Sequence, residues 1–320
     1  MCCCMAVLDI QDLKVHYYTL TGIVRAVDGV SLSVNKGEWI SIVGESGSGK
    51  STLALSIPRL IMPPGRIVGG RILYSGVDLL SLAGEELRRY RGREIGMVFQ
   101  DPTAYLDPYR TVGSQIAESL LEHGLASSGS EAESMAGDAL ELVGIPRDRA
   151  SVYPHQLSGG QRQRVAIAAA VALEPKILIA DEPTTALDVV VQAKIMDLMK
   201  KLQEERGLTV MLVTHDIGLA AEYSDRIAVM YAGELVEIGP AEDVVSNPIH
   251  PYTEMLIKSV PDPWEDREVK PIPGSPPDLR NPPPGCRFHP RCPLRQPLCT
   301  NTRPSLRMVD GGRGHSCLVR

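Results

Sequence analysis

A glycine-rich turn at residues 44–52 constrains the fold of this chain more than any other feature. It follows the apolar run Trp39–Val43 and opens a helical stretch, and it fits the pattern G-x-x-x-x-G-K-[ST]. Glycines let such a loop wrap tightly, so that successive N–H groups point at phosphate oxygens. Lys50 would supply charge for the β- and γ-phosphates, and Ser51 a hydroxyl for Mg²⁺. The residues expected to bind the nucleotide here are Gly44, Glu45, Ser46, Gly47, Ser48, Gly49, Lys50, Ser51 and Thr52.

The first 250 residues alternate strand-like and helix-like segments. Short runs rich in branched residues, each fitting a strand buried on both faces, occur at residues 39–43, 95–99, 177–180 and 210–213. Helical stretches are expected at residues 161–173 and 189–205. This alternation predicts an α/β fold with a mainly parallel sheet covered by helices.

Three other regions depart from that alternation. Residues 7–17 and 24–34 predict antiparallel pairing at an edge. Residues 114–145 predict a helical lobe with a Gly/Ser break at 127–130. Beyond residue 260 lie 13 of the 25 prolines, and this composition predicts an extended arm because proline removes backbone donors.

The strand predicted at residues 177–180 ends in two acidic residues, Asp181 and Glu182. Strand ends of this kind lie at the carboxyl edge of a sheet, beside a phosphate loop. Asp181 can then hold Mg²⁺ through water, and Glu182 can orient and polarise the attacking water.

Composition excludes several classes of protein. The chain has 320 residues, 43% of them hydrophobic, which suits about two globular domains. Its net charge of -6 argues against holding nucleic acid by bulk charge. No apolar run approaches the roughly 18 residues of a membrane-spanning helix, and the first ten residues lack the pattern of a secretory signal. A cytosolic chain is expected, with any membrane contact peripheral and through partners.

Between the two phosphate-site elements lies a second glycine-rich turn, made of Leu157, Ser158, Gly159, Gly160 and Gln161. With this LSGGQ sequence the chain strongly resembles the ATPase subunits of ABC transporters. Its physical logic is again a turn that opens a helix and forms an anion site. In that family the turn faces the γ-phosphate bound to the opposite subunit, so that a head-to-tail dimer buries two ATP molecules.

The remaining motifs of the family follow in order. Gln100 resembles the glutamine that contacts Mg²⁺ and links the core to the helical lobe. Asp188, in the sequence Ala-Leu-Asp that begins at Ala186, resembles the loop that crosses the dimer interface. His215 resembles the switch histidine at the γ-phosphate, and Tyr17, or alternatively Tyr18, the aromatic residue that stacks on adenine. The resemblance covers residues 7–250 and implies a hydrolytically competent site.

The end of the chain narrows the resemblance to one branch. His-Pro-Tyr-Thr begins at His250, and the sequences Cys-Arg-Phe at Cys286 and Arg-Cys-Pro at Arg291 follow, as in the oligopeptide and dipeptide importer ATPases. Ala169, where many relatives have an arginine, resembles the first of the two ATPases of these importers. The expected domains are an ATPase domain at residues 1–249, with a helical subdomain at about 101–157, and an extension at 250–320 with a four-cysteine segment at 286–317.

The four cysteines of the extension, spaced C-x5-C-x6-C-x17-C, are Cys286, Cys292, Cys299 and Cys317. Four thiolates can hold a [4Fe–4S] cluster or one zinc ion, and these gaps are wider than those of usual zinc knuckles. Some members of the branch that this chain resembles carry a cluster at matching cysteines, so the cluster is favoured over zinc or free thiols. Cys2, Cys3 and Cys4 are interpreted as free thiols of a tail.

The resemblance implies the ATP-hydrolysing subunit of a peptide importer, with ATP and Mg²⁺, at the cytoplasmic face of the membrane. Its partners would be two permeases, an external binding protein and a second, different ATPase; a homodimer stays open. The cargo is not fixed by this chain, and a nickel importer is the alternative. A ribosome-binding ABC protein generally has two cassettes, a repair ATPase has large insertions, and a small-molecule kinase would lack LSGGQ.

Overall fold

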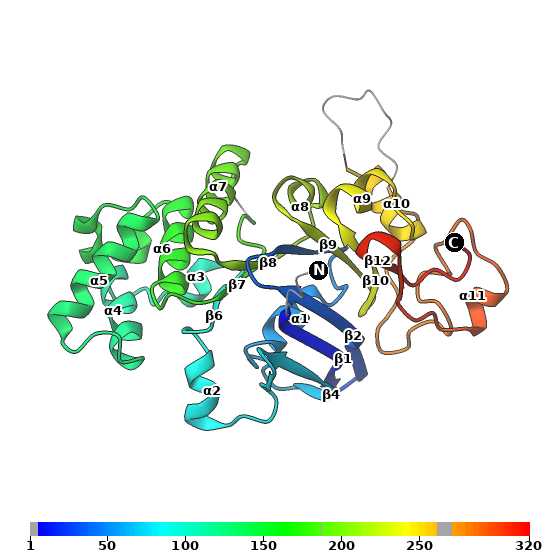
Figure 1. Cartoon of the computed structure of the whole chain (residues 1–320), viewed down its shortest axis with the longest axis horizontal. Coiled ribbons are helices and arrows are strands. Elements are labelled where there is room, and N and C mark those ends of the chain that lie inside the picture. The colour runs from blue at the N-terminus through cyan, green and yellow to red at the C-terminus, as the bar shows by residue number, and fades with distance from the viewer. Residues whose placement is uncertain (1–5, 186, 261–270) are drawn as a thin grey trace. The chain divides into compact units, whose positions relative to one another are not determined.

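The computed structural model describes residues 6–185, 187–260 and 271–320. The chain forms two compact units, one made of Met1–Ser81 and Leu212–Arg320, the other of Leu82–Met211. Figure 1 shows the elements of both. The predictions for Cys2, Cys3, Cys4 and Ala186 fall outside the described residues. Within those residues, no helix is both long enough and apolar enough to cross a membrane.

The first unit contains a four-stranded antiparallel sheet in the order β2-β1-β4-β5. Its strands are β1 (Ala6–Thr19), β2 (Gly22–Asn35), β4 (Gly65–Tyr74) and β5 (Val77–Asp78). Leu8, Ile10, Leu13 and Val15 of β1 are buried. Such apolar residues stabilise a strand by packing one of its faces on the core. The antiparallel pairing expected near the start of the chain is confirmed.

A second set of strands in the first unit follows the order β11-β12-β10-β9-β3. The fully buried β3 (Trp39–Val43) pairs in parallel with β9 (Arg226–Tyr231), and β9 pairs antiparallel with β10 (Glu234–Pro240). Beyond β10 lie β12 (Arg313–His315) and β11 (Arg307–Val309). The end of the chain is therefore not only the extended arm that its prolines predict. Its last two strands cover the edge that β10 would otherwise expose.

Short helices complete the first unit. They are α1 (Lys50–Ser56), α8 (Ile217–Tyr223), α9 (Ala241–Ser246), α10 (Pro251–Lys258) and α11 (Leu298–Asn301), with a 3-10 turn at Asp310–Gly312. The core of this unit is formed by residues from both of its sequence ranges, Met1–Ser81 and Leu212–Arg320. Phe288 of the extension is buried against Tyr231 of β9 and Tyr252 of α10. Burying an aromatic side chain stabilises such a core by about 2–3 kcal/mol.

The second unit contains a parallel pair of strands, β6 (Ile95–Val98) and β7 (Ile177–Asp181), as expected. Its helices are α2 (Gly84–Tyr90), α3 (Pro102–Tyr105), α4 (Val112–Glu122), α5 (Gly129–Leu142), α6 (Gly159–Val171) and α7 (Val189–Arg206). Two 3-10 turns, Arg147–Ser151 and Pro154–Gln156, precede α6. The helices α4 and α5 pack together, and the predicted break between them is present. Strand β8 (Thr209–Thr214) runs across the boundary of the two units.

Candidate nucleotide-binding site

The phosphate loop of the first unit lies between β3 and α1 and curls around its own lysine. The Lys50 side chain is 4% exposed, and its Nζ donates to the carbonyl of Gly44 at 2.8 Å and to that of Glu45 at 3.0 Å. An ammonium group held inside a loop of backbone groups is the charge that a phosphate chain requires. The expected strand–loop–helix context of the motif is present.

Two glycines make this loop possible. Gly44 and Gly49 have φ angles of 155° and 104°. A Cβ at Gly44 would lie 2.2 Å from the carbonyl oxygen of Met230, and one at Gly49 would lie 2.1 Å from that of Ala26. Ser48 Oγ is buried and has no hydrogen-bond partner among the described residues. The backbone is therefore packed too tightly for side chains, while one inward hydroxyl remains for a ligand.

Tyr17 is the predicted adenine-stacking residue that lies near α1. Its hydroxyl is 3.4 Å from Thr52 Oγ1, and its ring is half-buried. Tyr18 is exposed and has the guanidinium of Arg66 over its ring at 5.7 Å. The geometry favours Tyr17 of the two. His215, the predicted switch residue, is exposed directly after β8, the neighbour of β3 in the strand order.

The phosphate loop also contacts the C-terminal extension, which the sequence analysis did not foresee. The N–H of Glu45 donates to Tyr252 Oη at 2.8 Å. The Glu45 carboxylate accepts two hydrogen bonds from Arg291, at 2.7 and 3.0 Å. No local signal could have shown this, because the partners are more than 200 residues apart in the chain.

In the second unit the ends of two parallel strands bring Gln100 and Glu182 together. The register pairs Val98 with Ala180, so the residues that follow these positions lie at one edge. Gln100 Nε2 donates to Glu182 Oε2 at 3.1 Å, and Thr185 Oγ1 donates to the same oxygen at 2.9 Å.

The two acidic residues at the end of β7 differ in their surroundings. Asp181 is buried, whereas Glu182 is half-buried and has a left-handed backbone with φ of 45°. A strained backbone of this kind is uncommon outside glycine and is enriched at active sites. The backbone of Glu182 turns out of the strand at the point where the sequence predicts the catalytic carboxylate.

The signature turn of the second unit is held by its own side chains. Ser158 caps α6: its Oγ accepts from the N–H of Gln161 at 3.3 Å, and Gln161 Oε1 accepts from the N–H of Ser158 at 3.0 Å. A Cβ at Gly160 would lie 2.6 Å from Val191 Cγ1 of α7, whereas one at Gly159 would meet only Leu187 at 3.5 Å. Leu157 is buried beneath the turn.

Asp188, the other predicted interface residue, caps α7. Its carboxylate accepts from the N–H of Val191 at 3.0 Å, and the side chain is exposed. The next two residues, Val189 and Val190, are 80% and 63% exposed. Two exposed apolar side chains beside a short acidic cap suit a surface that a partner covers.

The four cysteines of the extension lie in one neighbourhood. Burial, and then the thiols of Cys299 and Cys292, raise the pKa of Cys286 to about 11. Burial, and then the thiols of Cys317 and Cys299, raise the pKa of Cys292. The N–H of Cys286 also donates to the carbonyl of Cys299 at 2.9 Å. Across the described residues, however, no three His, Cys, Asp or Glu side chains are arranged to hold a metal ion.

Comparisons with known proteins agree with this geometry. The family profile described as ABC transporter matches residues 27–185, and that of the oligopeptide/dipeptide transporter C-terminal region matches residues 236–299. The chain is 48% identical over 318 residues to the dipeptide transport ATP-binding protein DppD of Bacillus subtilis, covering 98% of this chain and 95% of the relative. It is 49% identical over 286 residues to the oligopeptide transport ATP-binding protein OppD of the same organism, covering 88% and 80%.

Solved structures show the same fold. A dimeric ATP-binding cassette bound to ADP and phosphate after hydrolysis matches with a TM-score of 0.66 and 36% identity, over 73% of this chain and 98% of that one. The protein CbiO1 of Clostridium perfringens, part of an ABC transporter complex, matches with a TM-score of 0.65 and 30% identity, over 76% of this chain and 91% of that one. This chain therefore belongs to the ABC transporter ATPases, in the branch that carries the oligopeptide/dipeptide transporter C-terminal region.

Proposed function

We propose that this chain is the ATP-hydrolysing subunit of an importer of oligopeptides or dipeptides. One observation carries the proposal: relatives named for dipeptide transport match 95% or more of their own length, including the C-terminal region. The cassette alone would support transport in general. The extension is the part that points to peptides.

The residues of the phosphate loop suit ATP. Lys50 would neutralise the β- and γ-phosphates, Ser48 Oγ would gain a partner, and backbone N–H groups of the loop would donate to the phosphate oxygens. Tyr17 would stack on adenine, and His215 would contact the γ-phosphate. Mg²⁺ would be held by oxygens of Ser51, Gln100 and Asp181, which are ligands that this hard ion prefers. Bound there, Mg²⁺ would offset the charge of the phosphates.

Glu182 would orient the attacking water. The two hydrogen bonds that its Oε2 accepts, from Gln100 and Thr185, fix the direction of the carboxylate. Oriented in this way, the carboxylate would polarise the water toward the γ-phosphate. The residues of the signature turn from Leu157 to Gln161, together with Asp188, would complete the site of a partner ATPase.

This proposal includes partners and a location. Two permease subunits in the membrane, an external peptide-binding protein and a second ATPase of different sequence would form the complex. The chain would lie at the cytoplasmic face, attached through the permeases. The helical subdomain at about residues 101–157 would contact the permeases, and the extension would begin at residue 250, after an ATPase domain at 1–249.

The four cysteines would hold a [4Fe–4S] cluster. The backbone contact between Cys286 and Cys299 supports this, and the C-x5-C-x6-C-x17-C spacing is wider than that of zinc knuckles. The cluster would brace the extension. Anaerobically purified protein should be brown with bound iron and sulfide, whereas colourless protein with one zinc would contradict this assignment.

The uptake of a labelled oligopeptide by cells tests the function. Cells whose only copy carries Glu182→Gln should lose uptake and ATP turnover, by about 10²–10⁴-fold in turnover, while still binding ATP. Glu204→Gln, the same change at an exposed position of α7, should leave uptake intact. Intact uptake in both variants would contradict the proposal. Loss of nickel accumulation in place of peptide uptake would instead assign the chain to a nickel importer.

A further inference from the structure

We propose that the C-terminal segment 286–292 positions the phosphate loop, and that Arg291 is a positioning residue for ATP binding that acts through Glu45. The inference goes beyond the proposed cargo and partners. It depends only on the contacts within the first unit.

The Arg291–Glu45 pair is a partly buried, bidentate contact. The guanidinium donates to both carboxylate oxygens, at 2.7 and 3.0 Å, and the two side chains are only 5% and 25% exposed. Planar arginine–carboxylate pairs of this kind fix orientation as well as charge. Breaking such a pair by removing one partner leaves the other charge uncompensated.

Groups of the extension and of β9 hold the side chain of Arg291 in place. Its Nε donates to the carbonyl of Pro273 at 2.8 Å, and the guanidinium lies over the ring of Tyr231 at 5.7 Å. It also donates to Tyr231 Oη at 3.3 Å. Although burial lowers it, the hydrogen bonds to Glu45 and Tyr231 raise the pKa of Arg291 overall. The cation is thus oriented by Pro273 of the extension and Tyr231 of β9, and is directed at the loop.

Glu45 is held from three directions, two of which belong to the extension. Its carboxylate binds Arg291, its N–H binds Tyr252 Oη, and its carbonyl accepts from Lys50 Nζ. Burial raises the pKa of Tyr252, so this phenol keeps its proton at neutral pH. A small shift of the extension would therefore move the first residues of the loop.

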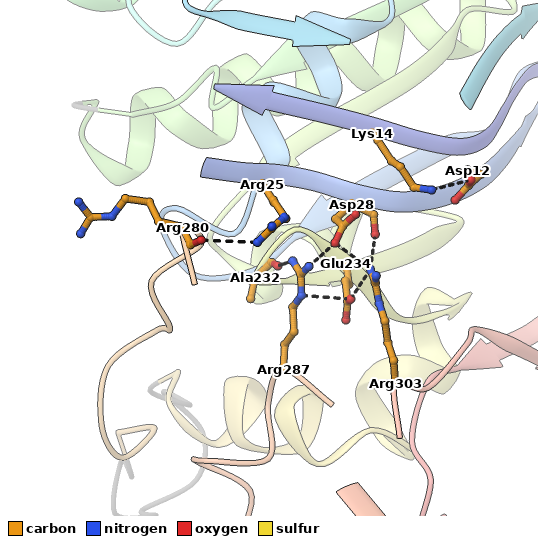
Figure 2. Close-up of polar contacts among 9 residues, drawn as sticks. All are labelled: Asp12, Lys14, Arg25, Asp28, Ala232, Glu234, Arg280, Arg287 and Arg303. Atoms are coloured by element: carbon orange, nitrogen blue, oxygen red, sulfur yellow. Dashed lines mark hydrogen bonds and ion pairs between the residues drawn. The ribbon is translucent and has the colours of Figure 1, made fainter. Parts of the chain in front are cut away.

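The same segment reaches the loop at a second point through Arg287. This side chain donates to the carbonyl of Ala232 and pairs with Asp28 and Glu234, as Figure 2 shows. Gly233, the residue after Ala232, donates its N–H to the carbonyl of Ser48 in the phosphate loop at 2.8 Å.

Figure 2 also shows a second cation at this cluster. Arg303 pairs with Asp28 at 3.0 Å and with Glu234 at 2.6 Å. One buried and one partly buried carboxylate, Asp28 and Glu234, thus meet two arginines of the extension. Arginines four residues apart, Arg287 and Arg291, therefore support the loop near Ser48 and at Glu45.

Charge explains why this support should affect ATP. Glu45 carries a negative side chain on the loop that would receive phosphates, and like charges repel more strongly where water is scarce. Arg291 neutralises this carboxylate and fixes its direction. Without Arg291, Glu45 would oppose the phosphates in addition to losing its two hydrogen bonds.

Equilibrium binding of ATP to the purified full chain tests this. Arg291→Ala should weaken binding about tenfold, and Arg291→Lys by less, since lysine keeps the charge but not the two-pronged geometry. Arg295→Ala removes an exposed arginine just beyond the segment and should change binding less than about twofold. In the assembled complex, Arg291→Ala should raise KM for ATP with little change in kcat.

A second substitution separates charge from simple loss of structure. Arg291→Ala combined with Glu45→Gln removes the unpaired carboxylate, and should bind ATP more tightly than Arg291→Ala alone. A double variant that binds ATP no more tightly than Arg291→Ala would contradict the charge argument, as would unchanged binding in Arg291→Ala. If Arg291→Ala does not fold, Arg291→Lys with and without Glu45→Gln gives the same comparison.

Discussion

The molecule contains two glycine-rich turns that each open a helix, and they are built in different ways. The signature turn before α6 is closed by its own residues, because Ser158 and Gln161 exchange hydrogen bonds at the surface. The phosphate loop before α1 begins its helix at Gly49, which has no side chain to cap it. It is held instead by distant groups, Tyr252 and Arg291.

This difference separates two ways of preparing an anion site. A turn that caps itself can fold locally and can change without disturbing the rest of its unit. A loop held by long-range contacts keeps its inward groups in place for a ligand, but depends on everything that holds it. The phosphate loop should therefore be the more sensitive of the two to substitution and to conditions.

The largest difference in stability between the two turns should appear when one methyl group is added to each. Gly49→Ala would place a Cβ 2.1 Å from the Ala26 carbonyl at φ of 104°, so unfolding free energy should fall by about 3 kcal/mol. Gly159→Ala meets only Leu187, at 3.5 Å, and should cost less than about 0.5 kcal/mol. Denaturant titration of both variants measures this, and equal losses would break the comparison.

Acid should lower the free energy of unfolding through His250, the cap of the helix α10 that carries Tyr252. His250 caps α10 by accepting the N–H of Tyr252 at 3.1 Å, and burial, with His315 and Arg320, lowers the pKa of His250 to about 3. The pKa of His250 in the unfolded chain is about 6.5. Below that pH the unfolded chain binds a proton at His250 that the folded chain does not bind, so acid favours unfolding. Stability should fall by about 1.4 kcal/mol between pH 7.5 and pH 5.5 from this residue.

The variant His250→Asn gives the control for that pH dependence. Asparagine keeps a side-chain acceptor for the cap but does not titrate. Denaturant titrations at the two pH values should show a smaller difference than in the wild type, by about 1.4 kcal/mol. The rest of the slope would include His315, whose pKa burial also lowers. An unchanged slope would show that His250 is not the group responsible.

A smaller effect on stability than that of Gly49→Ala or of acid should come from removing the cap of the signature turn. Ser158→Ala removes one side-chain acceptor and should cost about 1 kcal/mol. ATP binding to the isolated chain should stay within about twofold, whereas turnover by the assembled complex should fall at least tenfold, because one donor to the phosphates of the partner is lost. Weakened ATP binding by the isolated chain would show that the turn acts on its own nucleotide.

Much of the fold could be predicted because its strands are short, apolar and close to recognisable turns. Trp39–Val43 and Ile177–Asp181 are buried along their whole length. A short, continuous apolar run of this kind predicts a strand that is covered on both faces. The strands Arg307–Val309 and Arg313–His315 were missed, since three residues in a proline-rich region show no periodicity. They exist because β10 offers an edge, which is tertiary information.

The site residues divide in the same way. Lys50 and Ser158 stand in local patterns whose chemistry can be read from spacing. The contact of Arg291 with Glu45 joins residues 246 positions apart, and its geometry follows from the packing of Phe288 and Tyr252 beneath it. In the sequence, Arg291 belongs only to the Arg-Cys-Pro pattern that resembles the peptide importers, and that pattern does not indicate a contact with Glu45.

The most direct test of the central claim is ATP hydrolysis by the complete complex reconstituted in lipid vesicles. We expect the rate to rise several-fold when the external binding protein is loaded with an oligopeptide, and to stay near zero in either condition with Glu182→Gln. A wild-type rate that does not respond to peptide, or that Glu182→Gln leaves intact, would contradict the account.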